Sequence, residues 1–105
     1  MIDHLAIKHT LLELIRLLRA AHEHEWVQFL EDAKQRLERP ESTSRDAALD
    51  ILRSRSVFGG MGSLNDLVFS SHNENVPSGY SHESANRALI GLLSRLYSEV
   101  NPSAE

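Results

Sequence analysis

The order of apolar and polar positions along the chain predicts an all-α fold of about four helices. The first apolar stripe has the i, i+3, i+4, i+7 spacing of a buried helix face and consists of Leu11, Leu14, Ile15 and Leu18. Ile7 and Ala21 extend it, which predicts a helix over residues 3–21. Leu12 and Leu17 lie off this stripe, so the helix is apolar on more than one side. Such a helix is either central in the fold or packed against a partner chain.

The same spacing returns in the next segment and predicts a second helix over residues 24–39. Its apolar positions are Trp26, Phe29, Leu30, Ala33 and Leu37. The connecting stretch "AAHEHE" contains no Gly or Pro, so a single kinked helix is the alternative. A continuous helix of about 36 residues would be long for a chain of this size, which favours a break near His22. Pro40 ends the second helix, because a residue before proline disfavours helical geometry.

Capping chemistry predicts where the third helix begins. Thr43 or Ser44 can accept hydrogen bonds from the free amides of a first turn, and Asp46 suits the positive end of the helix dipole. Together with a buried face of Ala48, Ile51 and Leu52, these residues predict a helix over 44–56.

The last helix is predicted over residues 82–100. Ser81 is expected to cap it, and its apolar stripe consists of Ala85, Ala88, Leu89, Leu92, Leu93, Leu96 and Val100. Asn101 and Pro102 end the helix, and residues 101–105 are expected to form a frayed tail.

Residues 57–81 are predicted to be an irregular loop segment that is nevertheless structured. Three glycines crowd into "VFGGMGSLNDLVF", and a short apolar run follows them. Leu64, Leu67, Val68 and Phe69 are expected to anchor the segment, because two dozen residues without structure are unusual inside a compact domain. Ser63 is expected to cap a single helical turn, with extended chain after it. The stretch "SSHNENVPSGY" has the turn residues of a surface loop.

Size and composition favour one small domain over residues 1–105. The chain has 105 residues, 41% hydrophobic and 25% charged, which are ordinary values for a globular protein. It has no cysteine, which excludes disulfides, thiolate metal ligands and a cysteine nucleophile. It also has no run of about 18 apolar residues, so no membrane contact is expected and the expected location is the cytoplasm. The net charge of −4 argues against a nucleic-acid partner.

The glycines invite comparison with a phosphate-binding loop. Gly59, Gly60 and Gly62 are too close together for that motif, and no lysine follows them. The favoured interpretation is a tight turn: a helix ends at Phe58, and Gly59 or Gly60 takes a positive φ so that the chain can reverse. Asn65 and Asp66 are then expected to bond backbone amides and hold the turn, while contact with a partner is their alternative role.

No catalytic residue, metal ligand or cofactor site is predicted. His22 and His24 in "HEHE" are two positions apart and diverge on a helix, whereas helical zinc ligands lie three or four apart. A grouping of Ser63, His72 and Asp66 is conceivable on one loop, but their spacing matches no nucleophile motif. The protein is therefore expected not to be an enzyme.

The central stretch "FGGMGSLNDLVF" resembles the signature of a bacterial family of small uncharacterised proteins. The flanking segments "LLELIRLLRAAHEHEW" and "ANRALIGLLSRLY" are similar as well, so the resemblance covers about residues 10–98. Phe58, Gly59, Gly60, Gly62, Ser63, Asn65 and Asp66 carry it as a structural motif. Members are similar to the small proteins encoded beside secreted polymorphic toxins. The resemblance implies an immunity protein that binds and blocks one cognate toxin domain.

Charge adds a candidate binding surface to this expectation. Residues 57–80 contain two acidic side chains and neither Lys nor Arg, so an acidic face can meet a basic cleft on the toxin. The candidate partner-binding residues are Glu25, Asp32, Asp66, His72, Asn73 and Glu74. The alternatives are a structural or adaptor module that forms a homodimer through the apolar surface of the first helix, and a small regulator that binds an anion at the glycine turn.

Overall fold

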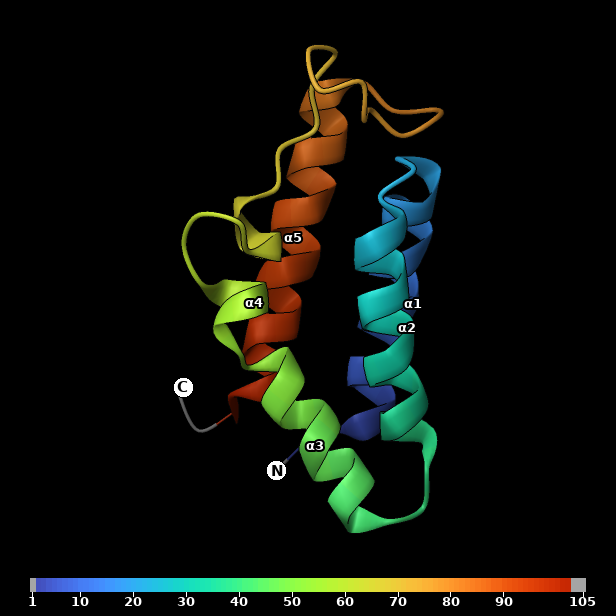
Figure 1. Cartoon of the computed structure of the whole chain (residues 1–105), viewed down its shortest axis with the longest axis vertical. Helices are drawn as coiled ribbons and strands as arrows, with labels where there is room; N and C mark the ends of the chain where they lie inside the picture. Colours follow the sequence, from blue (N-terminus) through green and yellow to red (C-terminus); the bar gives the residue numbers. More distant parts are fainter. Residues whose placement is uncertain (1, 103–105) are drawn as a thin grey trace.

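The computed structural model describes residues 2–102, and within them the fold is built from helices without a strand. These residues form four longer helices and two single turns, and Figure 1 shows how the helices are arranged. The longer helices are α1 (His4–Ala20), α2 (His24–Glu38), α3 (Ser42–Leu52) and α5 (His82–Val100). The single turns are α4 (Arg55–Phe58) and the 3-10 turn η1 (Leu64–Asp66). The predicted all-α fold with about four helices is confirmed, and α1, α2 and α5 begin and end within one residue of their predicted bounds.

Helix α1 is the central helix, as one of the two interpretations of its apolar pattern expected. It packs against both α2 and α5, while α3 packs against α2 and crosses the lower end of the molecule in Figure 1. The side chains of Leu11, Leu14 and Leu18 are fully buried. Leu17 is buried as well and Leu12 is half-buried, because two different helices cover α1. No helix within residues 2–102 has the length and apolar character needed to cross a membrane.

The break between α1 and α2 lies at His22, so the alternative of one kinked helix is wrong. His22 has a φ of 61°, which is the left-handed conformation that ends many helices. Its backbone N–H donates to the carbonyl of Arg19, and the N–H of Glu23 donates to the carbonyl of Leu18 at 3.0 Å. These bonds satisfy the last carbonyls of α1, and the chain then turns back into α2.

The start predicted for the third helix is wrong. Helix α3 begins at Ser42, two residues early, and its N-cap residue Glu41 makes no side-chain capping bond. The hydroxyl of Ser44 donates instead to the carbonyl of Arg36 at 3.0 Å, which ties α3 to the end of α2. Thr43 is exposed and also does not cap the helix.

The predicted end of the third helix is wrong as well, because the helix is interrupted at Arg53 and Ser54. The Ser54 hydroxyl donates to the carbonyl of Ile51 at 2.6 Å, a local bond that competes with helix continuation. The guanidinium Nε of Arg53 donates to the carbonyl of Val100 at 2.6 Å, at the end of α5. The chain then forms the separate turn α4.

Helix α5 starts as predicted. The Ser81 hydroxyl accepts from the N–H of Ser84, and the Ser84 hydroxyl accepts from the N–H of Ser81, which completes a capping box. At the other end, the N–H of Asn101 donates to the carbonyl of Tyr97. Residues 103–105 of the predicted frayed tail lie outside the described residues.

Two asparagines hold the extended chain that follows η1. The side-chain amide of Asn86 on α5 accepts from the N–H of Phe69 and donates to its carbonyl, both at 2.8 Å. From the other side, Asn75 accepts from the N–H of Ser70 at 3.0 Å and donates to the carbonyl of Val68 at 3.1 Å. The aromatic ring of Phe69 is thereby fixed in the core.

The predicted anchors of this segment divide into two groups. Leu64 and Phe69 are fully buried, as expected, and Leu67 is half-buried. Val68 is 54% exposed, so its predicted anchoring role is wrong. The reason is that side chains alternate along extended chain, so Phe69 and Val68 point to opposite sides.

Candidate functional site

The glycine turn is a tight, internally hydrogen-bonded backbone reversal between α4 and η1. At Gly59 the backbone passes so close to α4 that an added Cβ would lie 2.3 Å from the carbonyl oxygen of Arg55. The positive φ is at Gly62, with a value of 86°. The prediction of a positive φ at Gly59 or Gly60 is therefore wrong, because Gly59 serves close approach and Gly62 serves the reversal.

Ser63 and Asp66 stabilise this turn from inside. The Ser63 side chain is buried, and its hydroxyl is within donating distance of the carbonyls of Gly59 (2.9 Å) and Gly60 (2.7 Å). It does not cap η1, so that prediction is wrong although the helical turn itself is present. The Asp66 carboxylate accepts from the N–H of Gly62 at 3.4 Å. Asn65 is exposed and makes no side-chain hydrogen bond among the described residues.

The position of Asp66 argues against an anion site at the glycines. A carboxylate already faces the amide of Gly62, and its negative charge repels a second anion. The backbone N–H of Ser63 donates to Gly60, and the N–H of Gly59 donates to Arg55. Both amides already donate hydrogen bonds within the turn, so they are not available to bind an anion.

The turn presents Met61 at its tip, where the side chain is 99% exposed. Next to it lie two adjoining hollows of about 410 and 440 Å³, which share Trp26, Gly62 and Ser63 in their walls. We call the residues around both hollows the Trp26 surface. They are Trp26, Phe29, Arg55, Ser56, Met61, Gly62, Ser63, Asp66, Leu67, Val68 and Asn73.

Helix α2 supplies the aromatic part of the Trp26 surface. Trp26 and Phe29 are one turn apart, and their rings meet edge to face with centroids 5.6 Å apart. Both side chains are half-buried against the core, so each ring keeps one part open to solvent. Beyond them, Val68 adds an exposed apolar side chain from the extended segment. Isolated exposed apolar residues are common, but several that border the same hollows indicate a binding surface.

The structure brings together some of the predicted partner-binding residues but not all of them. Asp66 and Asn73 belong to the Trp26 surface, and Glu25 is the neighbour of Trp26 in α2. His72 and Glu74 are exposed in the following turn but do not line the hollows. Asp32 is exposed nearly two turns further along α2, where Gln28 donates to it at 3.1 Å.

The remaining candidate chemistry is dispersed. His22 and His24 have ring centroids 6.0 Å apart, and no group of three potential metal ligands gathers within residues 2–102. Ser63 is bonded to backbone carbonyls, and no hydrogen bond joins it to His72 in the part of the chain described.

One carboxyl group has a displaced pKa, and it lies far from the Trp26 surface. Burial raises the pKa of Glu38, but hydrogen bonds and the charges of Lys8 and Lys34 outweigh burial and lower it overall. Glu38 ends α2, about 18 Å along the helix from Trp26 at 1.5 Å per residue.

Sequence reasoning missed the residues that position this surface. Asn75 and Asn86 hold the extended segment, and Asn75 also donates to Glu23 at the corner between α1 and α2. A buried asparagine in a loop rich in polar residues carries no periodic signal. Met61 was noticed only as part of the glycine stretch, and its exposure follows from the turn around it.

Together these features define a small all-α protein with a central helix and a surface of aromatic and apolar side chains built around a glycine turn. A family model described as "Domain of unknown function (DUF6966)" matches residues 19–78, and the chain belongs to this family. The matched segment contains every residue of the Trp26 surface and leaves α5 outside. No curated protein and no solved structure matches the chain. The expected likeness to immunity proteins stays a prediction.

Proposed function

We propose that this protein is a non-enzymatic binding protein that neutralises a cognate bacterial toxin domain by covering it with the Trp26 surface. The observation that carries this proposal is Met61, a fully exposed apolar side chain held on a tight turn beside a half-buried tryptophan. Burial of such a side chain in a partner is favourable, and water otherwise surrounds it. The family resemblance of the sequence supplies the class of partner.

The chemistry of the surface suits a protein partner. Tryptophan and methionine are enriched at the centres of protein interfaces, where a few well-packed anchors provide most of the binding energy. The backbone of the turn is already held by Ser63 and Gly59 in the free protein, so little backbone entropy is lost when Met61 is buried and the entropic cost is mainly that of its side chain. A partner can insert side chains into the two hollows on either side of Trp26.

Charge supports a basic partner. Asp66 borders one hollow, Glu25 lies beside Trp26, and Glu74 is exposed in the next turn, while residues 57–80 contain no Lys or Arg. Arg55 is the one cation among the residues of the Trp26 surface. Acidic side chains at the edge of an interface speed association with a basic surface and reject acidic partners.

The test pairs the protein with the product of the adjacent gene, which the resemblance implies is the toxin. Co-expression is expected to rescue growth, and the purified proteins are expected to form a complex. Met61→Glu places a charge at the tip and should weaken binding at least about tenfold, the range of an interface hot spot. Because Met61 contacts solvent, the variant should fold normally.

Leu5→Glu is the matched control. Leu5 is 67% exposed near the start of α1, where an added charge changes solubility in the same way without touching the Trp26 surface. It should bind like the wild type. The proposal is wrong if the two proteins neither bind nor rescue growth. Equal binding by Met61→Glu and wild type would refute the Trp26 surface as the interface.

A homodimeric adaptor is the second candidate, for which we propose an interface on α5 instead of α1. The apolar sides of α1 are covered by α2 and α5, so the predicted dimer surface on α1 is used within the chain. Exposed apolar side chains lie on α5 instead, where Ile90 is 68% and Tyr97 49% exposed, and Tyr97 meets Phe58 edge to face. Sedimentation of wild type and Ile90→Glu decides this candidate, because a dimer through α5 should dissociate in the variant.

A further inference from the structure

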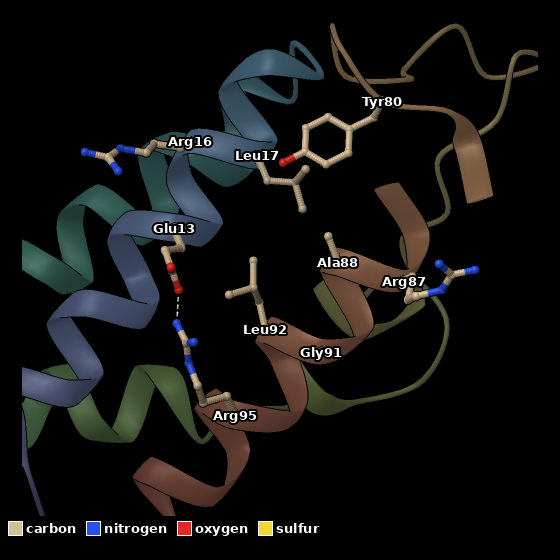
Figure 2. Close-up of a pocket in the computed structure, with 9 residues that line it drawn as sticks. All are labelled: Glu13, Arg16, Leu17, Tyr80, Arg87, Ala88, Gly91, Leu92 and Arg95. Atoms are coloured by element: carbon tan, nitrogen blue, oxygen red, sulfur yellow. Dashed lines mark hydrogen bonds and ion pairs between the residues drawn. The ribbon is translucent and has the colours of Figure 1, made fainter. Parts of the chain in front are cut away.

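A groove between α1 and α5 is separate from the Trp26 surface and has the size of a small-molecule site. Its volume is about 590 Å³, within the usual range of ligand pockets. Figure 2 shows Leu17 of α1 and Ala88 and Leu92 of α5 directed into the space between the two helices. None of the residues lining the groove belongs to the Trp26 surface, and none falls within the family match.

Gly91 keeps the groove open. It lies in the middle of α5, where glycine is less favourable than alanine. An added Cβ at this position would have nothing within 4 Å, so neighbouring side chains do not require a glycine here. What the missing side chain provides is free space in the wall of the groove.

Side chains border the groove at both ends, which limits the length of an occupant. The ring of Tyr80 covers the upper end in Figure 2, and the ion pair between Glu13 and Arg95 bridges the two helices at the lower end. Ala88 and Arg95 are seven residues apart, which corresponds to about 10 Å along a helix. A space of this length suits a small molecule better than a helix of a partner protein.

Arg95 offers a pre-positioned guanidinium N–H donor at the lower end. Its Nε donates to the hydroxyl of the buried Thr10 at 2.9 Å, and its Nη2 donates to Glu13. The Thr10 hydroxyl in turn donates to Glu99 at 2.6 Å. The Nη1 of Arg95 has no partner within residues 2–102, so it can donate to an incoming anion.

The edges of the groove make its mouth positive. Arg16 and Arg87 lie on opposite sides, with their guanidinium groups directed outward in Figure 2, and neither forms an ion pair within the described residues. Glu13 is the one carboxylate in the lining, and Arg95 neutralises it. The chain as a whole has a net charge of −4, so this is a local reversal of sign.

We propose that the α1–α5 groove binds a small amphipathic carboxylate, with an alkyl or aryl body on Leu17, Ala88 and Leu92 and its carboxylate toward Arg95. Tyr80 lies at the opposite end of the groove, where its ring can cover the far end of the body. Arg16 and Arg87 attract the anion to the mouth and strengthen its binding over longer range. This site is independent of toxin binding and can exist whether or not that proposal holds.

The test titrates the full chain with octanoate and follows backbone amide shifts by NMR, with affinity from calorimetry. Shifts are expected in α1 and α5 around Leu17 and Leu92. Octan-1-ol, which has the same body without the charge, should bind at least tenfold more weakly, and inorganic phosphate should not bind. Gly91→Leu fills the groove and should lose at least tenfold in octanoate affinity.

Two further variants separate binding from folding. Gly91→Ala raises helix propensity in the same way but fills little space, so it should keep octanoate binding close to wild type. The double variant Arg16→Gln, Arg87→Gln changes only exposed side chains and should weaken binding several-fold, with a smaller dependence on salt. The proposal is overturned if Gly91→Leu binds octanoate like wild type. It is also overturned if octan-1-ol binds equally well, or if the shifts lie outside α1 and α5.

Discussion

The amide of Asn86 should be among the most sensitive polar groups of this protein, and Asn86→Ala tests it. The side chain makes both hydrogen bonds that a neighbouring strand would make to Phe69, at 2.8 Å each. Replacement by alanine leaves the N–H and the carbonyl of Phe69 without their partner. Both groups lie beside a fully buried ring, where water reaches them poorly.

The magnitude follows from two opposing terms. Each unsatisfied buried group costs about 1–3 kcal/mol, and for two partly buried groups we take about 2–4 kcal/mol together. Alanine is a better helix former than asparagine, so the substitution stabilises α5 by roughly 0.5 kcal/mol. The free energy of unfolding should therefore fall by about 1.5–3.5 kcal/mol. For a domain of about 100 residues this lowers Tm by roughly 6–28 °C.

Urea unfolding followed by circular dichroism at several pH values measures this change. Asn65→Ala is the control, because Asn65 is an exposed asparagine of the same region without a side-chain bond among the described residues. It should change stability by less than about 0.5 kcal/mol. The reasoning is refuted if the two alanine variants have the same stability.

Asn86→Asp gives an independent signature. At neutral pH the new carboxylate accepts from the N–H of Phe69 but repels its carbonyl. The protonated acid can both donate and accept, like the amide it replaces. The folded state therefore binds this proton more tightly than the unfolded chain does, so the pKa of the new carboxyl group is raised on folding. The stability of the variant relative to wild type should rise as pH falls through that raised pKa.

Two other predictions concern single contacts. Gly59→Ala should destabilise the protein by about 1–3 kcal/mol, because the new Cβ meets a backbone carbonyl. Gly60→Ala should be nearly neutral, because its Cβ meets nothing within 4 Å. Thermal unfolding of both variants tests this, and equal melting temperatures would contradict it. Lys8 and Lys34 lower the pKa of Glu38 on folding. The contribution of Glu38 to the free energy of unfolding is therefore present above the ordinary glutamate pKa and is lost as pH falls through the lowered pKa. Glu38→Gln should remove this dependence as pH falls below the ordinary glutamate pKa. The effect should be well under about 1 kcal/mol, because Glu38 is exposed and solvent screens its ion pairs. An unchanged acid limb of the Tm profile would refute it.

Local pattern was sufficient to predict the long helices. The stripes of α1, α2 and α5 are regular over several turns, and the capping box at Ser81 and Ser84 lies within four residues. Periodicity and capping are short-range signals, so a sequence displays them directly. The break at His22 was also predictable, because a continuous helix would have been too long.

The interruption after α3 combines the local bond of Ser54 with a distant contact that a local pattern does not contain. Arg53 bonds to Val100, which lies 47 residues further along the chain. The position of the positive φ in the glycine turn was mispredicted for a different reason. Glycine serves both close backbone approach and positive φ, and sequence does not tell which glycine serves which purpose.

The candidate site was predictable only in part. Asp66 and Asn73 were named as partner-binding residues and do lie on the Trp26 surface, but their role stays a prediction. Trp26 and Met61 are 35 positions apart in sequence, and only the fold brings them together. Their common surface depends on where the glycine turn and the extended segment lie, which the sequence pattern does not give.

The pairing of α1 with α5 has a consequence for synthesis on the ribosome. Thr10 and Glu99, which bond across the two helices, are 89 positions apart. At 5–20 residues per second, roughly 4–18 s pass between the synthesis of one and the other. During this interval α1 can pair with α2, but its second side stays uncovered and open to chaperones or to neighbouring chains. Faster translation, or a chaperone that shields this side, should raise the yield of folded protein without any change in its stability.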